Sequence, residues 1–190
     1  MSAGTTLEKQ TQTGRYTFTP EQYLRLAELG VIKGRTELRD GDILKMSPTS
    51  PLHNAYVLRL RRQLEAVLGT LVLVFEQSTV RLGDWLPEPD LLVAFYREDD
   101  YETGYPNTAE IALVAEISVS TLAEDRNEKV PRYAQAGVRE VWLYDAENQL
   151  LEVYRDPHGA TYRSKQTFAH DETLTLQAFP EHPGVFSPER

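Results

Sequence analysis

The chain has 190 residues, of which 41% are hydrophobic, a formal net charge of −9 and no cysteine. This length suits one domain, the acidic balance argues against nonspecific coating of nucleic acid, and the absence of cysteine excludes disulfides and thiolate metal sites. The apolar runs fall far short of the roughly 20 residues that cross a bilayer, and the polar start lacks the apolar region of a signal peptide, so we expect a cytoplasmic protein with no membrane partner.

Residues 1–15 are polar and without pattern, which predicts a disordered tail followed by a single domain at 16–190. The first element of that domain is a helix in FTPEQYLRLAELG. Thr19 suits the N-cap, Pro20 suits the first helical position, and Gly30 suits the end of the helix.

The next segments predict a hairpin and a longer helix. RTELRDGDILKM contains Asp40-Gly41, a dipeptide that two-residue hairpin turns favour. Residues 51–68 follow, with apolar side chains at helical spacing. We therefore expect a β-hairpin at 35–46 and a helix at 51–68.

The rest of the chain predicts a mixed β-sheet. Strands are expected at 71–82, 89–96 and 110–118, with the last two antiparallel across a polar loop. A helix that begins with a capping box at Thr121 and Glu124 and runs to about Ala136 leads to a strand at 139–145, which makes a parallel crossover. Pro131 would disturb that helix. A hairpin at 149–164, turning at 157–159, closes the chain. The predicted class is α/β, a mixed sheet flanked by helices with N-terminal and C-terminal β-hairpins.

This strand pairing places two acids opposite each other. If 90–96 pairs with 110–116 in the register that the loop suggests, Asp90 faces Glu116. Facing like charges destabilise a sheet, and a carboxylate beside the apolar run Ile111 to Ala115 carries a desolvation cost. A bound divalent cation would remove both penalties.

A lysine is expected to reach the same place. The helix from Thr121 runs back along the preceding strand, so eight residues at about 1.5 Å each return roughly 12 Å. That brings Lys129 level with Ala115 or Glu116, where its long side chain reaches the carboxylates.

Several motifs resemble a known family. PEPD at 87–90, VAEISVST at 114–121, the segment from Asp125 to Lys129 and YAQAGVREVWLYD at 133–145 occur in the order of the Uma-two family of restriction-endonuclease-like proteins. TELRDGDILKMSP, with His53 shortly after it, is similar to the N-terminal signature of that family. The resemblance implies the fold of the PD-(D/E)XK nuclease superfamily.

The resemblance also implies roles for four residues. Asp90 and Glu116 would be the motif acids and would hold Mg²⁺ or Mn²⁺. The superfamily lysine normally lies two positions after the second acid, where this chain has Ser118, and the family implies that Lys129 replaces it from the following helix. Glu37 is the candidate for an additional N-terminal acid.

The implied function is metal-dependent endonucleolytic hydrolysis of phosphodiesters in nucleic acid, with DNA as the expected polymer. Arg59, Arg61 and Arg62 would form a backbone-binding patch, and analogy with related nucleases implies a homodimer. One alternative is a noncatalytic nuclease-fold module that binds nucleic acid or protein, which the missing strand lysine and the acidic charge favour. Another is a hydrolase of small phosphoesters.

Plainer interpretations stand beside these roles. Asp90 also fits a turn residue after proline, Lys129 fits a solvated helix lysine, and the arginines fit a solvated helix face. Ser118 and Ser120 are expected to cap the following helix. His53 is expected to be half-buried and hydrogen-bonded without binding a metal.

Overall fold

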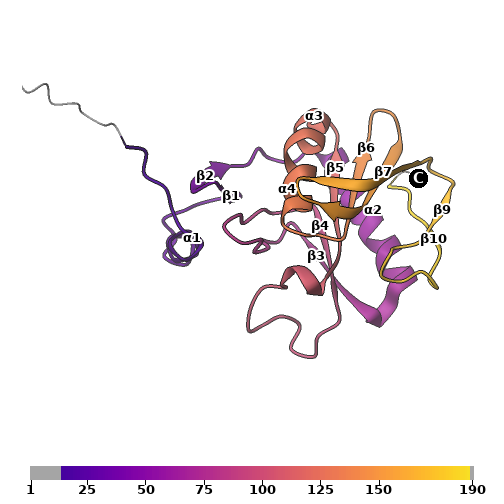
Figure 1. Cartoon of the computed structure of the whole chain (residues 1–190), viewed down its shortest axis with the longest axis horizontal. Coiled ribbons are helices and arrows are strands. Elements are labelled where there is room, and N and C mark those ends of the chain that lie inside the picture. The colour runs from indigo at the N-terminus through magenta and orange to yellow at the C-terminus, as the bar shows by residue number, and fades with distance from the viewer. Residues whose placement is uncertain (1–13, 189–190) are drawn as a thin grey trace, which may run out of the picture.

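The computed structural model describes residues 14–188, and its centre is a six-stranded mixed sheet (Figure 1). The strand order is β3-β4-β5-β6-β7-β8. The pair β5 and β6 is parallel and the other neighbours are antiparallel. The strands are β3 (Val72–Glu76), β4 (Leu91–Phe95), β5 (Ile111–Ser118), β6 (Glu140–Asp145), β7 (Leu150–His158) and β8 (Thr161–Phe168). The predicted α/β class is therefore confirmed.

The predicted register between the two acid-bearing segments is confirmed. Leu91 pairs with Ala115, and the next step in that register sets Asp90, just before β4, opposite Glu116. A bulge between Val93 and Ala94 shifts the far end of the pair, away from the acids. The bulge was not predicted, because β4 and β5 are buried on both faces and have no polar–apolar alternation for an extra residue to interrupt.

The connection from β5 to β6 is the predicted crossover, but its helix has three parts. They are α3 (Leu122–Glu124), a π-helical turn, η3 (Asp125–Lys129), and α4 (Val130–Gln135). Pro131 has no N–H to donate to the carbonyl four residues before it, and the Val130 N–H donates instead to the Asp125 carbonyl, five residues back. The expected disturbance at Pro131 is thus a widened turn, and Gly137, at φ 81°, ends the helix as predicted.

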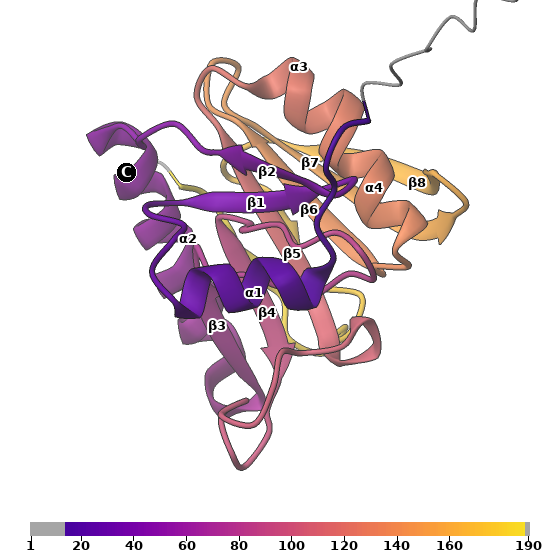
Figure 2. The same cartoon turned by 90° about the vertical axis from the view of Figure 1, so that its left-hand side faces the viewer.

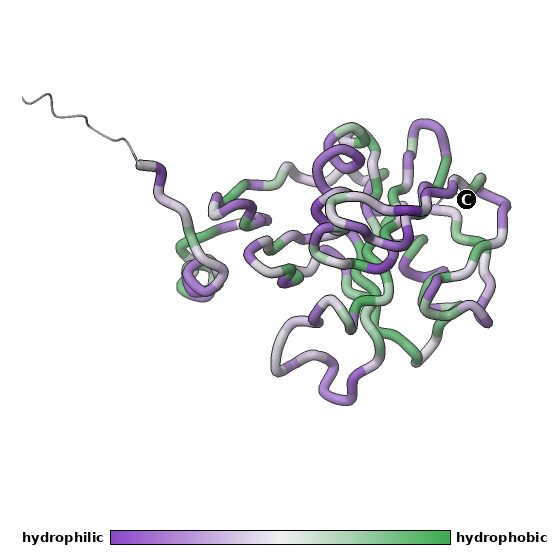
Figure 3. The backbone as a smooth tube through the Cα atoms, viewed as in Figure 1, coloured by the Kyte–Doolittle hydropathy of each residue, from purple (hydrophilic) through white to green (hydrophobic). Residues whose placement is uncertain are grey.

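Helices and loops bury both faces of the sheet. On one face, α2 (Pro51–Leu68) packs Val57, Leu60 and Leu64 against β4, β5 and β6, together with the C-terminal residues Leu176 and Phe186. On the other face, side chains of α4 and of the loop after β3 form a second cluster. Figure 1 shows α2 on one side of the sheet and α4 on the other. Figure 3 shows the hydrophobic residues concentrated in the strands between these two helices.

The N-terminal elements lie across the α4 side of the sheet (Figure 2). Helix α1 (Pro20–Glu28) has the predicted Thr19 cap, and the strands β1 (Thr36–Arg39) and β2 (Asp42–Lys45) form the predicted hairpin. Its turn needs positive φ at both central residues, 52° at Asp40 and 80° at Gly41. Leu38 and Leu86 exchange two backbone hydrogen bonds, which attach the hairpin to the loop between β3 and β4.

Two predicted elements have different bounds in the structure, and two short strands were not predicted. The strand expected at 71–82 ends at Glu76, and the chain then bends. The closing hairpin turns at 159–160 and not at 157–159, since Pro157 pairs with Tyr162 and His158 with Thr161. The short strands β9 (Thr173–Leu174) and β10 (Gly184–Val185) were not predicted.

The prediction of a disordered tail at 1–15 falls mostly on residues 1–13, which lie outside the described residues, and the single domain at 16–190 stays a prediction. Arg15, inside the described part, pairs with Asp42. Within residues 14–188, no helix has the length and apolar character needed to cross a membrane.

Candidate active site

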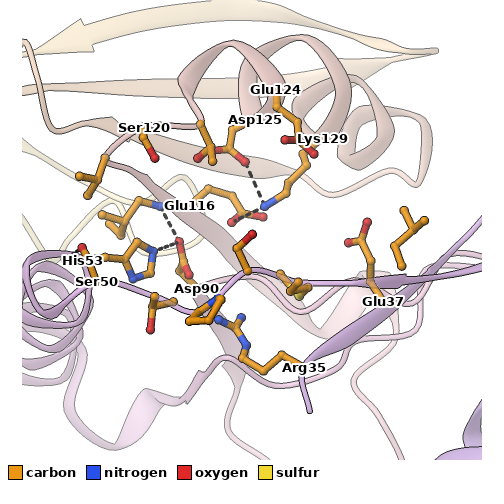
Figure 4. A pocket seen from close by; sticks show the side chains of 18 of the residues that line it. Arg35, Glu37, Ser50, His53, Asp90, Glu116, Ser120, Glu124, Asp125 and Lys129 are labelled. Atoms are coloured by element: carbon orange, nitrogen blue, oxygen red, sulfur yellow. Dashed lines mark hydrogen bonds and ion pairs between the residues drawn. The ribbon is translucent and has the colours of Figure 1, made fainter. Parts of the chain in front are cut away.

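The predicted acids and the lysine meet in one pocket of about 580 Å³ between the N-terminal hairpin, the start of α2 and the end of β5. Figure 4 shows the carboxyl groups of Asp90 and Glu116 pointing into it, with the Lys129 side chain coming from the helical crossover. Glu37 and His53 also line it. The geometric part of the prediction, that these side chains converge, is confirmed.

Asp90 is oriented through one of its two oxygens. Its Oδ2 accepts a hydrogen bond from the Ile117 backbone N–H at 2.8 Å and lies 3.0 Å from His53 Nε2. Burial lowers the pKa of His53, but the hydrogen bond and charge of Asp90 outweigh burial and leave that pKa above its ordinary value. The predicted half-buried, hydrogen-bonded histidine is confirmed, and its partner is a site acid.

Glu116 is buried on β5 and both of its oxygens are engaged. Oε1 accepts a hydrogen bond from the Tyr133 hydroxyl at 2.7 Å, and Oε2 lies 3.1 Å from Lys129 Nζ. Burial raises the pKa of Glu116, Lys129 lowers it, and Asp90 and Asp125 raise it again, with a net value of about 7. Burial beside two other acids thus makes ionisation of this carboxyl unfavourable unless positive charge is near.

Lys129 lies between two carboxylates. Its Nζ is 3.0 Å from Asp125 Oδ1 as well as 3.1 Å from Glu116 Oε2, and its side chain is only 14% exposed. Burial lowers the pKa of Lys129, but the charges of Glu116 and Asp125 raise it above its ordinary value. The amine is therefore an ammonium that donates to two carboxylates. Because it is buried and paired in this way, the solvated-lysine interpretation is wrong.

The expected helix caps are wrong. Thr121 makes no capping bond to the helix, and the hydroxyls of Ser118 and Thr121 both donate to Asp125 Oδ2. In a cap the hydroxyl oxygen would accept from a backbone N–H, whereas here each hydroxyl is turned to donate to a charged acceptor, which forms the stronger kind of hydrogen bond. Ser118, at the position where the superfamily lysine is expected, thus contacts Asp125, which holds Lys129. Ser120 lines the pocket.

Glu37 lines the pocket from β1, but its two oxygens differ. Oε1 is bound by Arg39, which also contacts Glu124 and Glu128 of the crossover helices. Oε2 is buried, and among the described residues no hydrogen bond to it is formed. A buried carboxylate oxygen without a donor is costly, so this atom is a candidate for contact with a cation or a water.

The three arginines predicted to bind a backbone do not line the pocket. Arg59 donates to the Pro188 carbonyl, Arg61 pairs with Glu65 and Glu76, and Arg62 is exposed. At about 100° per residue, neighbouring positions on a helix point in different directions, so Arg61 and Arg62 do not share one face of α2.

Two residues that contact Glu116 or Lys129 in the site were not among the predicted site residues. They are Tyr133 and Asp125. Tyr133 was given no role, although its spacing of four residues from Lys129 places both on one helix face. Asp125, one turn before Lys129, is a charged residue of a type that usually faces solvent on a helix, yet it is 3% exposed and lines the pocket.

The donor set fits a hard divalent cation. Among residues 14–188, no group of three or more His, Asp or Glu side chains is arranged to hold a metal. Mg²⁺ is commonly held by one or two carboxylates and completes its shell with water and substrate phosphate. Asp90 and Glu116 supply two such carboxylates in one pocket.

These features define a class, a restriction-endonuclease-like α/β domain with two acids and a lysine in one pocket. A sequence model of the Uma2 (Uma-two) family, described as "Putative restriction endonuclease", matches residues 20–183. The chain belongs to this family. No curated protein matches it significantly.

A similar fold has been solved for a protein from Anabaena variabilis ATCC 29413, described as "a putative nuclease belonging to DUF820". The TM-score is 0.68 at 18% sequence identity, and the alignment covers 88% of this chain and 95% of that chain. At this identity the likeness shows the shared fold alone.

Proposed function

We propose that this protein is a metal-dependent nuclease that hydrolyses phosphodiester bonds of nucleic acid, with DNA as the polymer. The observation that carries the proposal is the ammonium of Lys129 3.1 Å from Glu116, in the pocket into which Asp90 also points. Membership of a family described as a restriction endonuclease supports it.

Asp90 and Glu116 would hold Mg²⁺ or Mn²⁺. When bound, such an ion would lower the pKa of a water molecule and place positive charge near phosphorus. Asp90 suits this role because its hydrogen bonds with Ile117 and His53 involve Oδ2 and fix the carboxylate. Glu37, with its buried Oε2, is the candidate for a further acidic contact.

Lys129 would act as a donor and not as a base, because two carboxylates already keep it protonated. Its ammonium would contact a nonbridging phosphate oxygen and offset the negative charge that grows there in the transition state. In the overall reaction the oxygen of a water molecule forms a bond to phosphorus and one P–O ester bond breaks. One proton of the water passes to solvent and the departing oxygen takes up another, which leaves a phosphate monoester and a hydroxyl.

The remaining expectations rest on sequence and analogy. We propose a backbone contact through Arg59 and Arg62, which have no carboxylate partner among the described residues, and a smaller part for Arg61, which is already paired. A homodimer and a cytoplasmic location also belong to the proposal.

The second candidate is a noncatalytic module with the same fold. The observation that favours it is that both oxygens of Glu116 are already hydrogen-bonded within the protein, which satisfies this acid without a cation. This candidate predicts binding without hydrolysis.

The test is cleavage of plasmid and single-stranded DNA with Mn²⁺ or Mg²⁺ by the wild type, Asp90→Ala and Lys129→Ala, each shown to be folded by circular dichroism. We expect the wild type to cut at least one of the two substrates and both variants to lose that activity. An inert wild type would leave the binding module as the better explanation, and equal cutting by the variants would remove these residues from the reaction.

A further inference from the structure

The reacting groups lie at the bottom of the pocket. The side chains of Asp90, Glu116 and Lys129 are 9%, 3% and 14% exposed. The hairpin forms one wall, the first turn of α2 another and the crossover helices a third (Figure 4). A phosphodiester must therefore enter the pocket to reach these groups.

The pocket offers little positive charge to a polyanion. Of its four Lys and Arg side chains, Arg35 pairs with Glu88, Arg39 with Glu37, and Lys129 with Glu116, and its one histidine, His53, contacts Asp90. Lys45 remains, exposed at the end of β2, and within residues 14–188 it has no carboxylate within 4.0 Å. Five carboxylates line the same pocket: Glu37, Asp90, Glu116, Glu124 and Asp125.

Depth and charge together restrict the substrate. A duplex is a stiff cylinder whose binding usually relies on several phosphate contacts by Lys and Arg. Base pairing and stacking hold both backbones on this stiff cylinder, so a single phosphate does not leave it to enter a pocket. An unpaired strand bends freely and inserts one phosphate without bringing a second backbone against the acidic wall.

We propose that the substrate of this site is a single nucleic-acid strand that inserts one phosphodiester into the pocket, with Lys45 binding a phosphate next to the one that is cleaved. This inference rests on the proposed nuclease function and narrows its substrate class. It also assigns Lys45 as a substrate-binding residue, because it is the pocket cation that no acid of the described chain occupies.

The experiment compares three substrates with Mn²⁺: a labelled 20-nucleotide single strand, the same strand in a duplex, and bis(4-nitrophenyl) phosphate. We expect kcat/KM for the single strand to exceed that for the duplex at least tenfold. Binding of the single strand, measured by anisotropy with Ca²⁺ in place of Mn²⁺, should depend weakly on salt. Phosphate contacts by Lys45 and Lys129 give a slope of about −1.4 in log K against log [salt], and further contacts by Arg59 and Arg62 would bring it to about −2.8.

Two variants test Lys45. Lys45→Gln should raise KM for the single strand about three- to tenfold with little change in kcat, and it should reduce the salt slope by about 0.7. Lys33→Gln is the matched control, since Lys33 is exposed and does not line the pocket, and it should change neither quantity.

Failure of the inference is distinguishable from failure of the proposed function. Cleavage of the duplex as fast as the single strand would overturn the inference, and so would single-strand binding with a salt slope steeper than about −5. Either result would leave the proposed nuclease activity standing. Hydrolysis of the small diester alone would overturn the polymer substrate. No hydrolysis of any substrate would overturn the proposed function, and equal effects of the two lysine variants would remove Lys45 from the site.

Discussion

Lys129 reaches Glu116 from a helix, with Nζ 3.1 Å from Oε2, although the two residues are 13 positions apart. The π-helical turn Asp125–Lys129 brings Asp125 to the other side of the same ammonium. A carboxylate on a strand and one on a helix thus fix a single positive charge at the bottom of the pocket.

Replacement of Lys129 by Met is expected to lower the hydrolysis rate at least about 100-fold, because the ammonium would no longer offset charge at phosphorus. It should also destabilise the fold by about 3 kcal/mol, since it leaves buried carboxylates without their cation. Urea unfolding and single-turnover cleavage measure both effects. The double variant Glu116→Gln/Lys129→Met should recover part of the stability and none of the activity. Full activity of the single variant would contradict the role of Lys129.

The raised pKa of Glu116, about 7, predicts pH-dependent metal binding. A cation needs the ionised carboxylate, so the Mn²⁺ affinity should rise between about pH 6 and 8 and level off above that range. Isothermal titration calorimetry at several pH values measures it. In Glu116→Gln the rise should disappear, and an affinity that is constant from pH 6 to 8 in the wild type would contradict the prediction.

The same shift predicts how metal-free stability depends on pH. The pKa of Glu116 is higher in the folded than in the unfolded protein, so its contribution to the free energy of unfolding is fully present below pH 4.5 and is lost as the pH rises through 7. The loss is on the order of 3 kcal/mol. Relative to Glu116→Gln, the wild type should become less stable from pH 5 to 8. A constant difference between the two proteins would refute the shift.

Loss of the His53 ring should weaken metal binding without a large loss of stability. His53 orients Asp90 through Oδ2, and removing such supporting partners typically costs 10- to 100-fold in metal affinity. His53→Ala is therefore expected to bind Mn²⁺ at least tenfold more weakly in calorimetry, and His53→Asn, which keeps a donor, should recover part of the affinity. His170→Ala, at an exposed position, is the control. Unchanged affinity in His53→Ala would show that Ile117 alone orients Asp90.

Tyr133→Phe removes the hydroxyl that donates to Glu116 Oε1 at 2.7 Å. It should lower the free energy of unfolding by about 1 to 3 kcal/mol, because a buried carboxylate oxygen loses its donor, and it should also reduce activity. Tyr162→Phe is the matched control, since that hydroxyl donates at 2.7 Å to the Val138 carbonyl, away from the pocket. The control should lose stability without losing activity. Equal activity in both variants would show that Tyr133 is only structural.

Local sequence patterns predicted most of the fold. The cap at Thr19, the Asp40-Gly41 turn and the stop at Gly137 act within a few residues, so their effects are visible in the sequence. The bulge at Val93, the end of β3 at Glu76 and the pairing of β9 with β10 were not predicted. Those features depend on which segments pack together, and short apolar runs do not specify it.

For the site, the sequence by itself determined that Asp90 and Glu116 face each other and that Lys129 lies level with them, because strand register and helical rise are fixed by backbone geometry. Only the tertiary structure decided which hydrogen-bond partners these groups choose. Ser118 and Thr121 bind Asp125 and do not cap a helix, and Tyr133 and His53 hold the two acids. The physical reason is burial: away from water each charged group must find its partners among whichever side chains the fold brings near, and that set is known only once the chain has folded.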